Sequence, residues 1–99
     1  MLEQIISGEC RDTVLGIKVP APQIKCVDGT ALSVQASASH YCAPRDDVGP
    51  YSLVEVGYLS EDPKAWEEYR DGAIYGFVPV DKVREFVALH GGLVPQATI

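Results

Sequence analysis

The sequence contains few cysteines, and the three that it has are widely separated. Cys10, Cys26 and Cys42 form an odd set without a CxxC pair. Secreted disulfide frameworks normally have an even number of cysteines, and zinc sites in small domains normally include a closely spaced pair. We therefore expect reduced thiols, no metal site and no cofactor.

Long hydrophobic runs and positive charge are also lacking. No stretch reaches the roughly 18 apolar residues that a transmembrane helix needs, and the first residues lack the basic segment of a signal peptide. Only eight Lys and Arg stand against 14 Asp and Glu, which gives a formal net charge of −6. Because nucleic-acid-binding domains usually carry a basic stripe, we expect a cytoplasmic protein that contacts neither nucleic acid nor membrane directly.

Motifs of the common enzyme classes are missing as well. The nine glycines are scattered and form no phosphate-binding loop, which argues against ATPases, kinases and Rossmann dehydrogenases. Neighbouring carboxylates such as Asp46 and Asp47 point apart, so they make poor acid–base pairs. His40 and Cys42 can share one face of a strand, but no cysteine-hydrolase signature surrounds them. The sequence therefore predicts a protein without catalytic residues.

What the sequence does contain is typical of one small folded domain. Its 99 residues are 46% hydrophobic and 22% charged, close to the averages for globular proteins. We expect a single domain over residues 1–99, with residues 1–22 and 93–99 at its periphery. Because a chain this short buries only a modest core, we also expect a homodimer.

The hydrophobic pattern predicts an α+β fold with about four strands and two helices, in the order β-β-β-α-β-α. The strands are expected at residues 23–27, 31–37, 51–59 and 73–78. The first helix is expected at residues 62–70, with Asp62 as its N-cap. The second helix ends at Gly91 and has apolar residues and a histidine at helical spacing (Val83, Phe86, Val87 and His90). This order favours a small antiparallel sheet with helices packed on one face.

The clearest local signal is Asp28-Gly29, which supplies the positive φ of a tight hairpin between the first two strands. In the second of these strands, apolar and polar residues alternate, which predicts one buried face and one open face. The buried set is Leu32, Val34, Ala36 and Ala38, and the open set is Ser33, Gln35, Ser37 and Ser39. A further strand is expected at residues 14–19, ended by Pro20.

The connection between the second and third strands is the candidate binding site, because it is long and rich in turn residues. The expected binding residues are Ser39, His40, Tyr41, Arg45, Asp46, Asp47 and Tyr51. In a functional interpretation, His40 and Arg45 hold an anion and Tyr41 stacks on a planar ligand. In the alternative interpretation, Asp46 caps backbone N–H groups and pairs with Arg45, while Tyr41 fills the core.

The same part of the chain carries a set of recognisable strings. They are SVQAS (33–37), HYC (40–42), PRD (44–46), GPY (49–51), VEVGY (54–58), YGFVP (75–79) and HGG (90–92). Over roughly residues 24–92 this pattern resembles small uncharacterised proteins encoded by bacteriophages and prophages. The resemblance implies a phage protein in the cytoplasm of its bacterial host, and it transfers no catalytic residue.

Small acidic phage proteins without catalytic motifs often inhibit host defence. We therefore expect a non-enzymatic, anti-CRISPR-like inhibitor that binds a protein component of a bacterial defence system through residues 39–51. A second hypothesis is a sponge that sequesters a nucleotide immune signal with His40, Tyr41, Arg45 and Asp46. The acidic charge argues against the sponge, whereas Arg45 and His40 favour it. A third hypothesis is a structural or morphogenetic phage protein.

Overall fold

The computed structural model describes residues 2–9, 13–14, 17–18 and 20–94. In chain order the elements are α1 (Leu2–Ser7), β1 (Thr13–Val14), β2 (Ile17–Lys18), β3 (Ile24–Lys25), β4 (Ala31–Gln35), β5 (Leu53–Gly57), the 3-10 helix η1 (Lys64–Tyr69), β6 (Arg70–Asp71), β7 (Ile74–Pro79) and α2 (Val80–Leu89). Among the described residues, no helix has the length and apolar character needed to cross a membrane.

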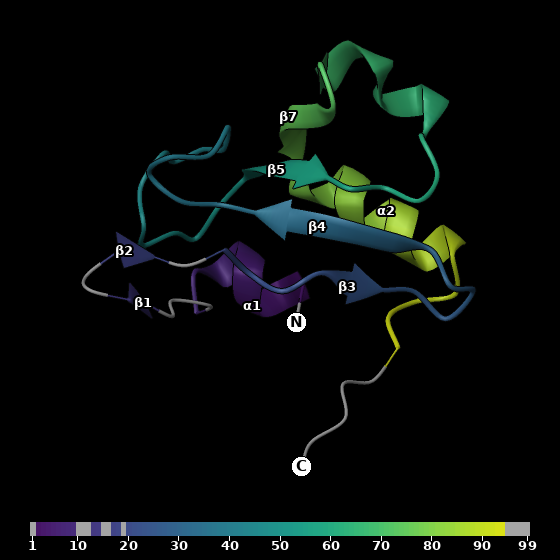
Figure 1. Cartoon of the computed structure of the whole chain (residues 1–99), viewed down its shortest axis with the longest axis horizontal. Coiled ribbons are helices and arrows are strands. Elements are labelled where there is room, and N and C mark those ends of the chain that lie inside the picture. Colours follow the sequence, from purple (N-terminus) through teal and green to yellow (C-terminus); the bar gives the residue numbers. More distant parts are fainter. Residues whose placement is uncertain (1, 10–12, 15–16, 19, 95–99) are drawn as a thin grey trace.

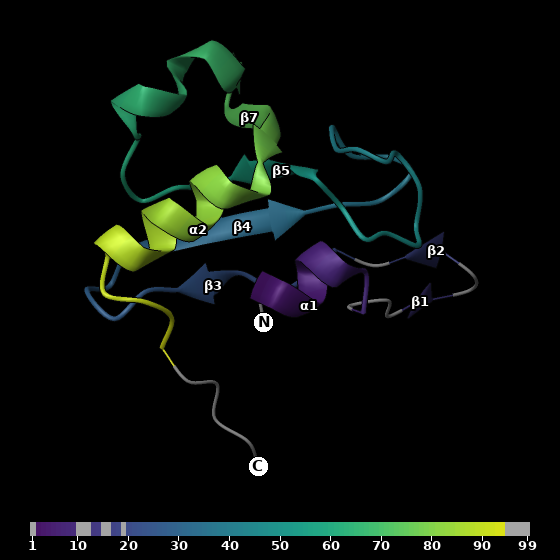
Figure 2. The same ribbon diagram turned by 180° about the vertical axis from the view of Figure 1, so that it is seen from behind.

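Five of these strands form one open antiparallel sheet in the order β3-β4-β5-β7-β6, and β1 pairs with β2 in a separate ribbon. Helices α1 and α2 lie on the same side of the sheet (Figures 1 and 2). The expected α+β class, with helices on one face of an antiparallel sheet, is therefore confirmed. The sheet has one strand more than expected, because the two-residue strand β6 gives no recognisable pattern in the sequence.

The β3–β4 hairpin forms at the predicted Asp28-Gly29 turn. Asp28 Oδ1 accepts a hydrogen bond from the backbone N–H of Thr30 at 2.9 Å, and Gly29 has a φ of +94°. A residue with a side chain is strained at that φ, which explains why glycine occupies the position. The turn chemistry therefore sets the register in which β3 and β4 pair.

The core lies between the sheet and the two helices. Alternate residues of β4, β5 and β7 are completely buried (Leu32, Val34, Val54, Val56 and Val78). Helix α2 contributes the three buried side chains that its spacing predicted, Val83, Phe86 and Val87. After α2, Gly91 takes a φ of +90°, as expected for the residue that follows a helix C-cap.

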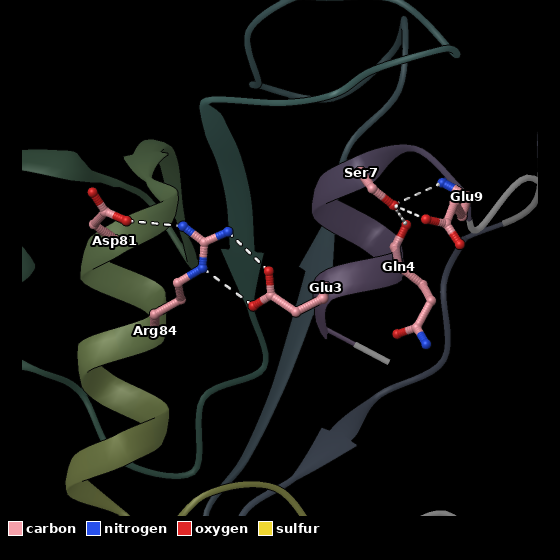
Figure 3. Close-up of polar contacts among 6 residues, drawn as sticks. All are labelled: Glu3, Gln4, Ser7, Glu9, Asp81 and Arg84. Atoms are coloured by element: carbon pink, nitrogen blue, oxygen red, sulfur yellow. Dashed lines mark hydrogen bonds and ion pairs between the residues drawn. The ribbon is translucent and has the colours of Figure 1, made fainter.

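Helix α1 is not predicted by the hydrophobic pattern, yet Leu2, Ile5 and Ile6 are part of the core. The Arg84 guanidinium on α2 donates hydrogen bonds to both carboxylate oxygens of Glu3, at 2.8 and 3.1 Å (Figure 3). A helix of six residues is not stable alone in water. Its formation therefore depends on these contacts with α2 and the sheet, which the local sequence does not encode.

The expected strand at residues 14–19 is wrong. Val14 is the pairing partner of Ile17, so the chain reverses between them and forms two short strands. Leu15, Gly16 and Val19 lie outside the described residues. The expected N-cap of the next helix is also wrong, because Pro63 occupies the N-cap position of η1 and no side chain caps it.

The polar row of β4 is less open than its alternation predicted, because Gln35 and Ser37 are buried. The Gln35 side chain accepts the N–H of Ala21 at 2.7 Å and donates to the carbonyl oxygen of Ala21 at 2.8 Å. The side-chain amide thus forms with Ala21 the two hydrogen bonds that the backbone of a neighbouring strand would form. Period-two alternation describes one strand and contains no information about a distant segment that covers it.

Strand β7 contains a bulge that decides where its aromatic residues point. Val54 pairs with Val78 and Val56 pairs with Tyr75, so residues 76–77 of β7 face a single residue of β5. Phe77 has a φ of +52°, in the left-handed region that side chains rarely adopt. As a result, Tyr75 and Val78 are buried whereas Phe77 is exposed.

Candidate functional site

The loop of residues 39–51 is shaped by hydrogen bonds from its own aspartates. Asp47 Oδ1 accepts the backbone N–H of Ala38 at 2.8 Å. Asp46 Oδ1 accepts the N–H groups of Val48 and Gly49, both at 2.9 Å. This is the capping role that the alternative interpretation gave to Asp46. Both carboxylates fix the path of the loop.

Three other candidate residues are also engaged within the chain. The buried Tyr51 donates its hydroxyl to the carbonyl oxygen of Asp46 at 2.7 Å. Ser37 Oγ lies 2.6 Å from Nδ1 of His40 and 3.1 Å from Oγ of Ser39. These contacts join the loop to the segment that follows β4.

Four of the candidate residues are exposed, and two of them, Tyr41 and Arg45, lie against each other (the others are Ser39 and Asp47). The Arg45 guanidinium carbon lies 5.4 Å from the centre of the Tyr41 ring, a cation–π distance. The Tyr41 ring lies 5.8 Å from that of Phe77, and the Tyr41 carbonyl accepts the Phe77 N–H at 2.9 Å. Tyr41 is 38% exposed and Phe77 is 45% exposed. We call Tyr41, Arg45 and Phe77 the exposed aromatic cluster.

Beside this cluster lies a hollow of about 410 Å³, which we call the aromatic hollow. It is lined by Tyr41, Glu68, Tyr69, Asp71, Gly76 and Phe77. A Cβ atom at Gly76 would lie 3.1 Å from that of Tyr41, so glycine lets the loop pack closely on β7. The hollow therefore combines the loop with η1, β6 and β7.

Sequence reasoning identified Tyr41 but missed the other side chains of the hollow. Glu68 and Asp71 belong to an acidic run that predicts a solvent-exposed helix face, and the three-residue spacing places Tyr69 on one face with Trp66. Regular alternation places Phe77 on the same strand face as Tyr75. The positive φ of Phe77 places it elsewhere, and that φ depends on the pairing with β5. The one usable signal is the aromatic residue beside Gly76, because a glycine within a strand often marks a bulge.

A second polar group joins the β3–β4 turn to the end of α2. His90 Nδ1 lies 2.6 Å from Asp28 Oδ2 and 3.0 Å from Thr30 Oγ1, and its Nε2 lies 3.8 Å from Glu61 Oε2. Hydrogen bonds from the backbone and hydroxyl of Thr30, and then from His90, lower the pKa of Asp28 to about 2. This group fastens the hairpin to the helix.

The side chains of Cys26 and Cys42 are both buried. Burial raises the pKa of Cys26, and the Asp28 carboxylate adds to the effect. Cys42 donates its thiol to the carbonyl oxygen of Ser37 at 3.1 Å. Within the described part of the chain, which does not include Cys10, no group of three His, Cys, Asp or Glu side chains is placed to hold a metal ion. Cys26 and Cys42 both belong to the hydrophobic core.

The chain was compared with family models, with curated proteins and with solved structures, and none of the three comparisons gives a match. Its function must therefore be inferred from the geometry of the chain itself.

Proposed function

We propose that the protein is a non-enzymatic inhibitor that binds one protein component of a bacterial defence system through the exposed aromatic cluster. The observation that carries this proposal is the exposure of Tyr41, Arg45 and Phe77 side by side. Tyrosine and arginine are enriched among the residues that dominate binding energy, and phenylalanine is enriched in interface cores. The resemblance to phage proteins supplies the class of partner and the host cytoplasm as the location.

The hydrogen bonds around the cluster support a binding role. The hydrogen bonds of the 39–51 loop and the backbone bond between Phe77 and Tyr41 hold the rings before any partner arrives. A preorganised surface loses less conformational entropy on binding, which leaves more of the contact energy as affinity.

The backbone conformation of Phe77 also supports a binding role. A non-glycine residue in the left-handed region costs about 1–2 kcal/mol. An exposed phenylalanine regains little of that cost by burial within its own chain. Strain of this kind is concentrated at binding and catalytic sites, so an observed outlier supports a functional hypothesis.

The aromatic hollow favours a protein partner over a nucleotide signal. Glu68 and Asp71 line it, and carboxylates repel phosphate groups. His40 and Asp46, two residues of the nucleotide hypothesis, already bond to Ser37 and to the turn that follows Asp46. The acidic lining therefore supports protein binding more than the sponge.

The test is a phage plating assay in bacteria whose CRISPR–Cas system targets the infecting phage. Expression of the wild-type chain is expected to raise the efficiency of plating at least tenfold. Tyr41→Ser combined with Phe77→Ser should abolish the effect, because the variant removes both exposed rings. The control is Leu89→Ser, which removes an 84% exposed apolar side chain on α2 and should behave as wild type.

Two results would contradict the proposal. The first is full activity of the double variant, which would remove the aromatic cluster from the mechanism. The second is an unchanged efficiency of plating with every CRISPR–Cas type in a representative panel. Thermal unfolding of each variant shows whether a loss of activity reflects a loss of folding. A defined high-order assembly by sedimentation would favour the morphogenetic role instead.

A further inference from the structure

We infer that the aromatic hollow takes up a cationic side chain, an arginine above all, from the surface of the protein partner. The inference deepens the proposed function, since it supplies the chemistry of the group that the binding surface recognises. It rests on the rings that line the hollow, on the charges at its edge and on a contact that the chain already makes.

The rings come from three separate segments of the chain. Tyr41 lies in the 39–51 loop, Tyr69 ends η1 and Phe77 lies at the β7 bulge, and all three line the same hollow. The face of an aromatic ring carries negative charge density and attracts a cation within about 6 Å of its centre. A hollow with several rings therefore favours a cationic group that has an apolar stem.

The chain itself shows that this surface accepts a guanidinium. Arg45 lies over the Tyr41 ring at 5.4 Å and does not line the hollow. This contact places a guanidinium over one of the three rings that line the hollow. At this distance the Arg45 guanidinium and the Tyr41 ring attract each other by a cation–π interaction.

Two carboxylates complete the hollow. Glu68 and Asp71 are exposed and line it together, and no ion pair found among the described residues includes either of them. Nearby acids do have such partners, for example Glu67 with Arg70 at 3.8 Å. Two exposed carboxylates beside three rings make the lining complementary to a positive charge, and the net charge of −6 acts in the same direction.

The Tyr69 hydroxyl remains a hydrogen-bond donor next to this negative charge. Burial raises its pKa, and the neighbouring Glu68 carboxylate raises it further. The residue therefore stays neutral at physiological pH and does not add a third negative charge.

Arginine fits this lining better than lysine. A planar guanidinium can stack on a ring and at the same time donate hydrogen bonds in its plane to two carboxylates, whereas an ammonium group acts as a point charge. A volume of about 410 Å³ is within the range of ordinary ligand pockets, which is enough for one long side chain.

The test uses nuclear magnetic resonance of the ¹⁵N-labelled full chain with two short peptides as probes. One is acetyl-Gly-Gly-Arg-Gly-Gly-amide, and the other has the neutral isostere citrulline in place of arginine. The arginine peptide is expected to shift the backbone amide signals of Tyr69, Asp71 and Phe77, with millimolar affinity. The citrulline peptide should shift them at least threefold less at equal concentration.

A matched pair of charge variants locates the effect. Glu68→Gln should weaken binding of the arginine peptide about three- to fivefold, because it removes one carboxylate without changing the shape of the hollow. Glu85→Gln makes the same chemical change at an exposed site on α2 and should leave the affinity unchanged. Equal shifts with both peptides, or equal losses in both variants, would overturn the inference.

The outcomes separate this inference from the proposed function. If the chain restores phage plating but the arginine peptide shifts no signal of the hollow, the cation inference fails and the proposed function remains. If the arginine peptide binds selectively but no defence system is inhibited, the hollow recognises a cation and the proposed function fails.

Discussion

The molecule has two aromatic clusters, one buried and one exposed to solvent, and each includes a residue of strand β7. In the buried cluster, Trp66 lies edge-on to Tyr75, with ring centres 5.8 Å apart, and 5.2 Å from Phe86. In the exposed cluster, Tyr41 and Phe77 are also 5.8 Å apart, but both rings are open to solvent. Tyr75 and Phe77 are two residues apart, so regular alternation would place them on the same face.

The difference between the clusters comes from one inserted residue. The bulge at residues 76–77 leaves Tyr75 buried against Trp66 of η1 but places Phe77 outside, at a positive φ. Tyr75 gains stability from burial, whereas Phe77 bears backbone strain and remains exposed. One cluster is therefore part of the core, and the other is the surface to which the proposed function assigns binding.

The largest expected effect is on stability. Phe86→Ala should lower the free energy of unfolding by about 3–5 kcal/mol, because it leaves a cavity between Trp66 and the sheet. Phe77→Ala should change it by no more than about 1 kcal/mol, since the ring is exposed. Urea unfolding followed by tryptophan fluorescence measures both. Equal losses would mean that the exposed cluster is part of the stabilising core.

A smaller effect isolates the strain at the bulge. Phe77→Gly should be more stable than Phe77→Val by about 1 kcal/mol, because glycine adopts a positive φ freely and a β-branched residue does not. Both variants remove the ring, so the loss of its contacts is common to the two. The same urea experiment measures it. A more stable valine variant would show that the bulge relaxes without strain.

The third effect concerns the β3–β4 turn, which is held to α2 by His90, whose ring lies 4.5 Å from that of Phe86. Because the pKa of Asp28 is lowered to about 2, its charge stabilises the fold fully above the unfolded value near 4. That contribution is lost as the pH falls from about 4 through 2. Asp28→Asn should therefore be less stable than wild type at pH 5, and the difference should shrink towards pH 2. A difference that does not vary with pH would contradict this account of the turn.

Local signals in the sequence are sufficient for part of the fold. The Asp28-Gly29 hairpin and the spacing of Val83, Phe86 and Val87 follow from a few adjacent residues, and both predictions are confirmed. Helix α1 is missed because six residues form a helix only through contacts with Arg84 and the core. The burial of Gln35 is missed for a similar reason, since its partner Ala21 is remote in the sequence.

The candidate site was predicted only where it depends on neighbouring residues in the sequence, as the fold was. The long loop indicates where Tyr41 and Arg45 lie, because turn residues cluster there. The rest of the hollow depends on how β7 pairs with β5 and β6, which brings Phe77, Glu68 and Asp71 to the loop. Neither the homodimer nor the identity of the partner is tested by the fold, and both stay predictions.

The most direct test of the central claim is photo-crosslinking in bacteria that carry the inhibited defence system. The photoreactive residue p-benzoylphenylalanine replaces Phe77 in one experiment and Leu89, which is 84% exposed, in the other. The account predicts a crosslink to one defence protein from position 77 and none from position 89. Crosslinking of that protein from position 89 alone, or equally from both positions, would show that the exposed aromatic cluster is not the binding surface.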